Sequence, residues 1–376
     1  MTRTPHRPDV RRLAVGLLAL PLALVAACGA DQPTPTTQET PAAPVQVKGT
    51  VISTAVSSNE AQVVVPDPVA AAWTALGEKG SGLEWVSVAG DGTTKTSDLD
   101  LASDPAAGAT AAADKINTDA AQTDGRSALA GLDAVASPDK SPVWVFSPLL
   151  DTKDPVDFTK LAFDESPASV IKATKKAGDL PDLEGRQVTF VVTPVAGEQA
   201  KLSKLQIGYQ RAVWEGLAKA AGAKKVTFYD GTGTSAGTGT ISAIPIPDPN
   251  ADYASSEQGK TRTCTLPSPA LFVADQPALI DKKATLKALK KCVGDIDSGT
   301  KITVEGHTAG SSGTSNDFAK QLSTQRATEV AALLKELDVP AKNIVEVVGH
   351  GSSKPLVKPD TNPKNRAVVV TFSTTE

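Results

Sequence analysis

Short apolar runs alternate with longer segments of helical periodicity between about residues 48 and 245. The runs VWVFS (143–147) and QVTFVVTPV (187–195) are apolar almost throughout, as expected of strands buried on both faces of a sheet. The segment 198–223 instead has apolar residues at steps of three and four, which is helical spacing. Strands and helices that alternate in this way predict a doubly wound, mostly parallel α/β sheet.

The order of elements in this region, together with VWVFSPLLDT (143–152), resembles the von Willebrand factor A-type α/β domain. A generic Rossmann-like domain is the alternative. Many domains of the first type hold a divalent metal through D-x-S-x-S after the first strand. Here that place reads TAVSSNE (54–60), with Ser57 and Ser58 but no leading aspartate. Because a hard cation needs carboxylate oxygens, we expect no metal there.

The first 28 residues have the layout of an export signal. A basic stretch precedes an apolar run, 13–25, that is too short for an ordinary membrane span. V-A-A-C (25–28) resembles a bacterial lipobox, which implies that Cys28 carries palmitate and other acyl chains that hold the membrane. An ordinary signal peptide with a chance cysteine is the alternative. The export route, Sec or twin-arginine, stays open.

Composition excludes some classes of function. The net charge of −4 gives no bulk attraction to nucleic acid, and aromatic residues, at 4%, are too scarce for base-stacking surfaces. An exported chain meets an oxidising environment, so the remaining pair, Cys264 and Cys292, predicts a disulfide. Two unpaired buried thiols are the alternative.

The C-terminal part contains a second set of elements in the order β-α-β-α-β-β. We expect a strand in LFVADQPAL (271–279), helices at 282–296 and 316–337, and further strands in KITVEGHT, IVEVVGHG and NRAVVVTF. The last strand of the first domain is expected near 240–246. The predicted organisation is a signal peptide at 1–28, a Pro/Thr-rich tether at 29–47, an α/β domain at 48–246, a linker at 247–262 and a C-terminal domain at 263–376.

Several motifs of this C-terminal domain resemble the OmpA-like peptidoglycan-associating family. They are LFVADQPAL, VEGHT, LSTQRATEVAALL, GHGSSKP and NRAVVV. The resemblance implies a small α/β sandwich that holds the peptidoglycan stem peptide by its diaminopimelate residue. In the family an arginine of the R-A pair, here Arg326, binds a carboxylate, and an aspartate after G-H-T binds the ammonium group.

Arg326 also stands out without the resemblance. It lies in the apolar stripe of its predicted helix, where an unpaired guanidinium would cost several kcal/mol. It must therefore meet an anion or reach water. The anion is either a ligand carboxylate, which suits the planar guanidinium fork, or an internal partner such as Glu305 or Asp317.

The chain departs from the family at two of its binding positions. Ala309 replaces the aspartate after G-H-T, and Ala319 replaces an asparagine. The carboxylate that binds the ammonium group of diaminopimelate in the family is therefore missing here. The resemblance leaves a predicted ligand site of four residues, namely Thr308, Arg326, Asn365 and Arg366.

His307 and His350 both lie in G-H pairs at strand ends. Two imidazoles without a third ligand are weak evidence for a metal, so we interpret both as structural. The sequence has no nucleophile elbow or paired-carboxylate motif, and we expect neither enzymatic activity nor a cofactor.

The predicted function is a non-enzymatic envelope lipoprotein on the exported side of the membrane. Its C-terminal domain associates with peptidoglycan, and its α/β domain is left free for a protein partner. The alternative is that the OmpA-like domain has lost diaminopimelate binding and serves as a protein-interaction module.

Overall fold

A computed structural model describes residues 46–374, apart from 102–103, 136–139, 196–201, 237, 247–253, 295 and 312–313. The predicted signal peptide and lipidated Cys28 lie outside the described residues. The described residues belong to one compact unit of the chain, which spans Val45–Glu376. Among the described residues, no helix combines the length and apolarity that a membrane crossing requires.

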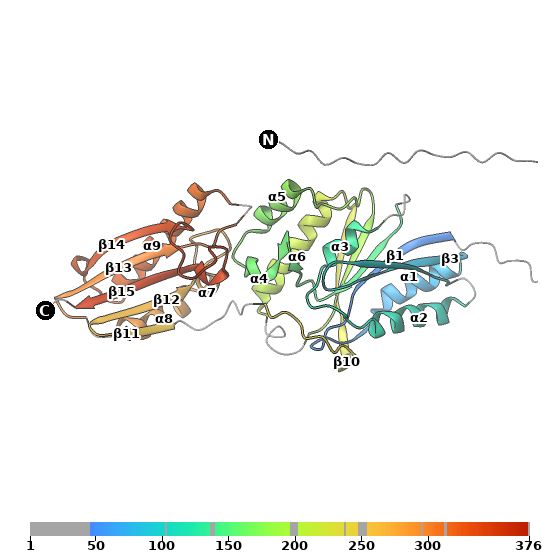
Figure 1. Ribbon diagram of the computed structural model, residues 1–376, viewed down its shortest axis with the longest axis horizontal. Helices are drawn as coiled ribbons and strands as arrows, with labels where there is room; N and C mark the ends of the chain where they lie inside the picture. The colour runs from blue at the N-terminus through green and yellow to red at the C-terminus, as the bar shows by residue number, and fades with distance from the viewer. Residues whose placement is uncertain are drawn as a thin grey trace, which may run out of the picture. The chain divides into compact units, whose positions relative to one another are not determined.

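The first half of this unit is built on a six-stranded sheet of order β4-β3-β1-β5-β8-β9. Neighbouring strands are parallel except for β4, an antiparallel edge strand paired with β3. The strands are β1 (Gln46–Thr54), β3 (Ser81–Val88), β4 (Thr94–Leu99), β5 (Val143–Ser147), β8 (Gln187–Val192) and β9 (Lys225–Asp230). The predicted doubly wound, mostly parallel sheet is confirmed (Figure 1).

Helices cover both faces of this sheet, as the continuous apolar runs of its central strands require. One face packs against α1 and α2 around the buried Trp73, and the other packs against α3, α5 and α6 around the buried Trp214. The helices are α1 (Asp67–Gly77), α2 (Pro105–Thr118), α3 (Ala128–Asp133), α4 (Phe158–Leu161), α5 (Pro167–Ala177) and α6 (Lys204–Ala220). Whether the domain is of the von Willebrand factor A or the Rossmann type stays a prediction.

Two small ribbons accompany the main sheet. One pairs β2 (Ala61–Val64) with β10 (Thr232–Ala236), and the other pairs β6 (Thr152–Lys153) with β7 (Val156–Asp157). The prediction of a last strand near 240–246 was wrong, because this segment is irregular and the strand lies earlier, at β10. The apolar ISAIPI run contributes the buried Ile246 to the core without forming a strand.

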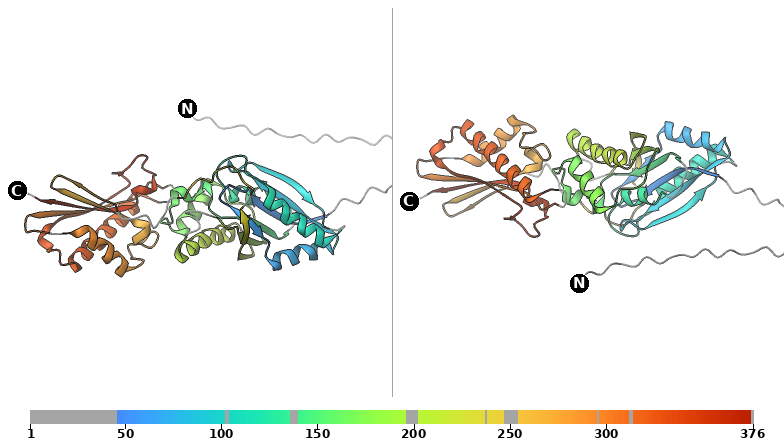
Figure 2. Two further views of the ribbon diagram at one scale, coloured as in Figure 1. Left: turned by 90° about the horizontal axis from the view of Figure 1, so that it is seen from below. Right: turned by 90° about the horizontal axis from the view of Figure 1, so that it is seen from above.

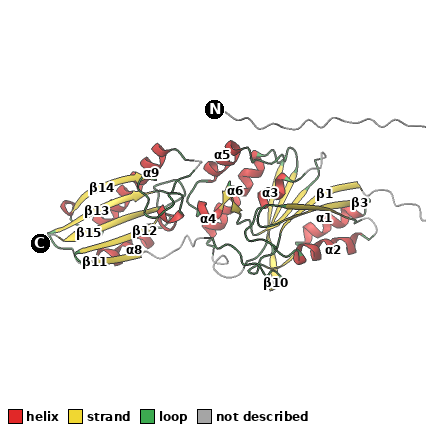
Figure 3. Cartoon of the chain, viewed as in Figure 1, coloured by secondary structure: helices red, strands yellow, loops and turns green. Residues whose placement is uncertain are grey.

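The second half is an α/β sandwich with a five-stranded sheet of order β11-β12-β15-β13-β14. Only β13 and β14 are parallel to each other. The helices lie on one face of this sheet (Figures 2 and 3). Its elements are β11 (Ala254–Gln258), β12 (Thr261–Pro267), α7 (Ser268–Leu271), α8 (Lys282–Val293), β13 (Thr300–His307), α9 (Asn316–Glu336), β14 (Ile344–Gly351) and β15 (Ala367–Thr374), with 3-10 turns at Ala341–Asn343 and Pro363–Asn365.

Two predictions about this half were wrong. The segment 247–262, expected to be a linker, contributes β11 as an edge strand of the sheet, although the side chains of β11 are exposed and, apart from Ala254, polar. LFVADQPAL was expected to be a strand, but β12 comes before it, and the segment forms the end of α7 and a loop closed by a bridge between Phe272 and Leu279.

The predicted disulfide between Cys264 and Cys292 is confirmed, with the two Cα atoms 6.0 Å apart. It joins β12 to α8, so it fixes a helix to the sheet across the core of the sandwich. Both cysteines are buried among apolar side chains.

Candidate functional site

Arg326 is placed by the close approach of α9 to the strands β13 and β14. Gly306 and Gly349 make this approach possible, because a Cβ atom at either one would lie within 2.2 Å of the backbone of α9. The helix is capped by Ser315, whose hydroxyl accepts a hydrogen bond from the backbone amide of Phe318. The resulting packing leaves Arg326 with no exposed surface.

The guanidinium of Arg326 binds a carboxylate from the first half of the chain. Its two terminal nitrogens donate to the two oxygens of Asp164, at 3.0 and 2.8 Å. Its Nε donates to the carbonyl of Gln276, at 3.1 Å. The group also lies over the ring of Phe272. Arg326 thus meets a carboxylate bidentately, which is the strongest arrangement open to it.

Asp164 reaches this position because the chain turns sharply after α4. Ala162 and Phe163 both adopt left-handed backbone angles, with φ of 48° and 61°. The backbone amide of Asp164 donates to the carbonyl of Leu161, and its own carbonyl accepts from the amide of Asp275. The first bond closes the turn, and the second holds the short segment 163–166 against the sandwich.

Asp275 fixes the other end of the same segment. Its carboxylate accepts hydrogen bonds from the backbone amide of Ser166, at 2.8 Å, and from the hydroxyl of Ser169, at 2.9 Å. Ser166 is the N-cap of α5. The sandwich therefore contacts the segment 163–166 through the cation Arg326 and the anion Asp275, and the Nε of Arg366 lies 3.7 Å from the carboxylate of Asp164.

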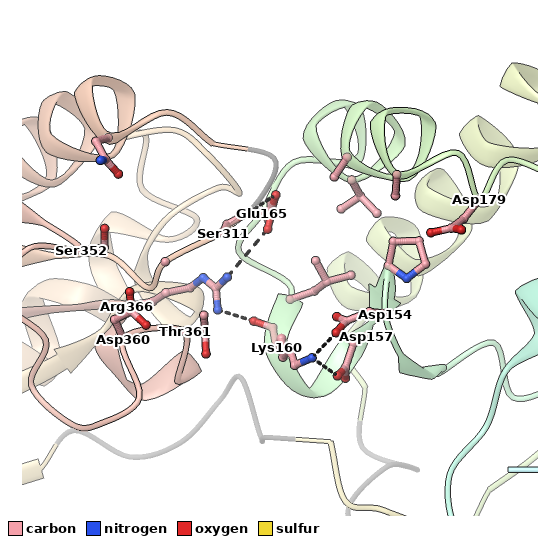
Figure 4. Close-up of a pocket in the computed structure, with 17 residues that line it drawn as sticks. Asp154, Asp157, Lys160, Glu165, Asp179, Ser311, Ser352, Asp360, Thr361 and Arg366 are labelled. Carbon is pink, nitrogen blue, oxygen red and sulfur yellow. Dashed lines mark hydrogen bonds and ion pairs between the residues drawn. The ribbon is translucent and has the colours of Figure 1, made fainter. Parts of the chain in front are cut away.

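Arg366 and Glu165 lie beside this pair and line a cavity of about 580 Å³ (Figure 4). Arg366 donates to the carbonyl of Lys160 and lies 3.9 Å from the carboxylate of Glu165. Glu165 also accepts from the hydroxyl of Ser311, at 2.7 Å. Burial raises the pKa of Glu165 above its ordinary value, although Ser311 and Arg366 oppose the shift.

Comparison with known proteins identifies the sandwich. Residues 271–368 match the OmpA family. This part of the chain is an OmpA-like domain. None of the curated proteins compared with the chain matches it.

Solved structures similar to the chain cover about a third of it. The periplasmic domain of Helicobacter pylori MotB is 21% identical, over 33% of this chain and 83% of that one, with a TM-score of 0.29. The cell wall anchor of the T6SS from Pseudomonas aeruginosa is 20% identical, over 33% and 88%, with a TM-score of 0.28. The OmpA-like domain of FopA1 from Francisella tularensis is 19% identical, over 35% and 89%, with a TM-score of 0.27.

Three of the four predicted site residues of the OmpA-like domain gather around Asp164. Thr308 and Arg366 line one small pocket with it, and Arg326 binds it directly. The hydroxyl of Thr308 is buried and has no hydrogen-bond partner in the described part of the chain. Ala309 lines the same pocket, so the position of the family's aspartate does face the site.

Asn365 has a different role from the predicted one. Its side chain is fully buried, and it exchanges hydrogen bonds with the backbone amide and carbonyl of Val357. Its amide group also donates to the carbonyls of Pro359 and Asp360. Asn365 therefore braces the loop before β15 and does not face the pocket.

The internal partners expected for Arg326 were also wrong. Glu305 instead binds His350 and Lys354, and Asp317 is exposed in the first turn of α9. Asp164, Glu165 and Asp275 were not among the predicted site residues. Of these, only Asp275 could have been found in the sequence, because its carboxylate lies inside the family motif LFVADQPAL. Asp164 and Glu165 belong to no motif that connects them with α9.

The α/β region contains a second buried arginine. Arg126 donates to the carboxylate of Glu60 and to the side-chain oxygen of Asn59, both at 3.0 Å. Ser57, one of the two serines singled out in the sequence, is buried and donates its backbone amide to Glu60. Ser58 is exposed. The absence of a metal at these residues stays a prediction.

Proposed function

We propose that this protein is an exported, lipid-anchored envelope protein that associates with peptidoglycan through its OmpA-like domain. The observation that carries the proposal is the bidentate grip of Arg326 on a carboxylate. The diaminopimelate residue of a stem peptide offers the same group. We propose a binding role without catalysis, with the α/β region left to contact a protein partner.

Asp164 stands where the ligand carboxylate belongs, so the chain and the wall compete for Arg326. Binding of a stem peptide requires the segment 163–166 to leave. Its departure also frees the carboxylate of Asp275 from Ser166 and Ser169. Asp275 then supplies the anion for the ligand ammonium that Ala309 cannot supply.

Co-sedimentation of the full chain with purified diaminopimelate-containing sacculi tests the proposal. Arg326→Lys keeps the charge but loses the planar fork, and we expect binding to weaken by roughly 10- to 100-fold. Asp164→Asn removes the competing carboxylate and should strengthen binding. Glu346→Gln makes the same chemical change at an exposed position of β14 and should leave binding unchanged.

In a second candidate function, the pocket around Arg326 binds a segment of this same chain and not peptidoglycan, so that the OmpA-like domain is an interaction module. Its support is that Arg326 donates to Asp164 and to two backbone carbonyls, of Gln276 and Val273. In this case neither the natural chain nor Asp164→Asn sediments with sacculi, although circular dichroism shows both to be folded. That result would reject peptidoglycan association and favour the interaction module.

A further inference from the structure

Glu305, His307 and His350 gather at the ends of the parallel strands β13 and β14. Glu305 and His307 are alternate residues of β13 and therefore point to the same face of the sheet. Gly306, between them, packs against Ser323 of α9, so this face lies opposite the helix. One potential ligand atom from each of the three residues lies within 4.8 Å of the others.

His307 is arranged as a metal-binding histidine. Its Nδ1 lies 2.9 Å from the carbonyl oxygen of Lys354. A carbonyl only accepts, so Nδ1 carries the hydrogen, and the lone pair of the neutral ring lies on Nε2. That atom is buried and has no hydrogen-bond partner among the described residues. Histidines that bind metals usually donate their other N–H to a carbonyl or carboxylate in this way.

His350 and Glu305 complete the group from the solvent side. The Nε2 atom of His350 lies 2.9 Å from a carboxylate oxygen of Glu305, and the two rings, of His307 and His350, have centroids 5.1 Å apart. The side chains of His350 and Glu305 are 23% and 22% exposed. The ammonium of Lys354 binds the same oxygen of Glu305, at 2.5 Å. Lys354 is thus the group that a cation would displace.

We propose that Glu305, His307 and His350 bind a divalent transition-metal ion of the zinc class. Two imidazole nitrogens and one carboxylate oxygen are a ligand set that zinc accepts, with a fourth position left for water. Ligands about 2.0–2.2 Å from the ion stand roughly 3.4 Å apart in a tetrahedron. The buried His307 is then the fixed point, and the two partly exposed side chains rotate inward.

The site would connect two loops of the OmpA-like domain. Thr308 follows His307 directly, and Ser352 lies two residues after His350. Both residues line the cavities around Arg366. An ion held between the strand ends would therefore fix the start of both loops. The sequence shows two histidines without a third ligand. Glu305 lies two residues before His307 on β13, and the register of β13 against β14 brings His350 beside both.

Isothermal titration of the chelator-treated full chain, in mild detergent, with zinc chloride tests the site. We expect one zinc ion per chain at this site. Loss of an outer-shell partner alone weakens metal binding by about 10- to 100-fold, so Glu305→Gln and His350→Ala should each weaken it at least tenfold. Both changes are at the partly exposed edge of the group, which spares the buried His307. Glu346→Gln on β14 is the matched control.

Lys354→Met gives a change of opposite sign. Removing the ammonium frees Glu305 and removes a like charge, so zinc should bind more tightly. Cobalt bound in place of zinc should give the visible absorption of a tetrahedral site, lost in His350→Ala. The proposal is overturned if zinc does not bind, or if Glu305→Gln and His350→Ala bind it as the natural chain does. The latter result would indicate adventitious binding elsewhere on the chain.

Discussion

Two buried arginines, one in each half of the chain, show how similar ion pairs can serve different purposes. Arg126 and Arg326 both have a carboxylate within 3.0 Å and side chains only 1% exposed. The partner of Arg126, Glu60, belongs to the same α/β region. The partner of Arg326, Asp164, lies 162 positions away and outside the OmpA-like domain.

The origin of the partner decides what each pair can do. Glu60 and Arg126 stay buried together unless their region unfolds. Asp164 and Arg326 belong to two different regions, and the proposed function requires their surfaces to separate so that a ligand carboxylate reaches the guanidinium. A buried charge pair therefore indicates a binding site only when its two halves can part without unfolding.

The largest effect is expected at the pair within the α/β region. Glu60→Gln leaves the guanidinium of Arg126 without its carboxylate and should lower the free energy of unfolding by about 3–5 kcal/mol. Urea denaturation at neutral pH measures this loss. Added stem peptide should not restore it. A loss below about 1 kcal/mol would show that Arg126 is not dependent on its ion pair.

The next largest effect is expected from reducing the disulfide, which only the second region contains among the described residues. The disulfide closes a loop between cysteines 28 positions apart, and it lies entirely in the second half. Its reduction should cost roughly 3–4 kcal/mol in the OmpA-like domain. Hydrogen exchange should show faster opening of β12 and α8, while β1 and β5 exchange as before. Equal acceleration in both regions would mean that they unfold as one unit.

Acid–base behaviour should also differ between the regions. Burial raises the pKa of Asp151 to about 6. The folded state therefore binds more protons than the unfolded chain between about pH 4 and 6, so stability falls as pH rises through this window. The shift corresponds to about 3 kcal/mol. Asp151→Asn should remove this fall. Urea titrations measure the free energy of unfolding of both proteins at pH 4 and 7, and the difference between the two pH values should be smaller in the variant.

The pKa of Glu305, in the OmpA-like domain, is shifted in the opposite direction. Burial raises its pKa, but hydrogen bonds from Lys354 and His350 outweigh this and lower it below the ordinary value. Its contribution to stability is therefore lost as pH falls.

If Asp151→Asn leaves the pH dependence of the first region unchanged, the carboxylate of Asp151 is not the source of that pH dependence.

The smallest effect is expected where the two regions meet. Asp164→Asn should cost only about 1–3 kcal/mol, because the amide oxygen of asparagine and two backbone carbonyls still accept hydrogen bonds from Arg326. A stem peptide at a hundred times its dissociation constant should return about 2.7 kcal/mol. A loss as large as that of Glu60→Gln, with no recovery, would remove the distinction between the two arginines.

The sequence by itself determined the kinds of elements and several of their roles. Apolar runs and helical spacing predicted the α/β sheet, because burial leaves a period that a few neighbouring residues reveal. The position of Arg326 in an apolar stripe predicted that it meets an anion or reaches water, and the compartment of an exported chain predicted the bond between Cys264 and Cys292.

Only the tertiary structure decided which groups meet. Asp164 reaches Arg326 through two left-handed residues and the packing of distant surfaces, and neither leaves a periodic trace in the sequence. The exposed strand β11 joins the sheet through backbone hydrogen bonds, which every residue type except proline can make. Local pattern reports how deeply a residue is buried, but the partner of a buried charge depends on contacts between segments far apart in the chain.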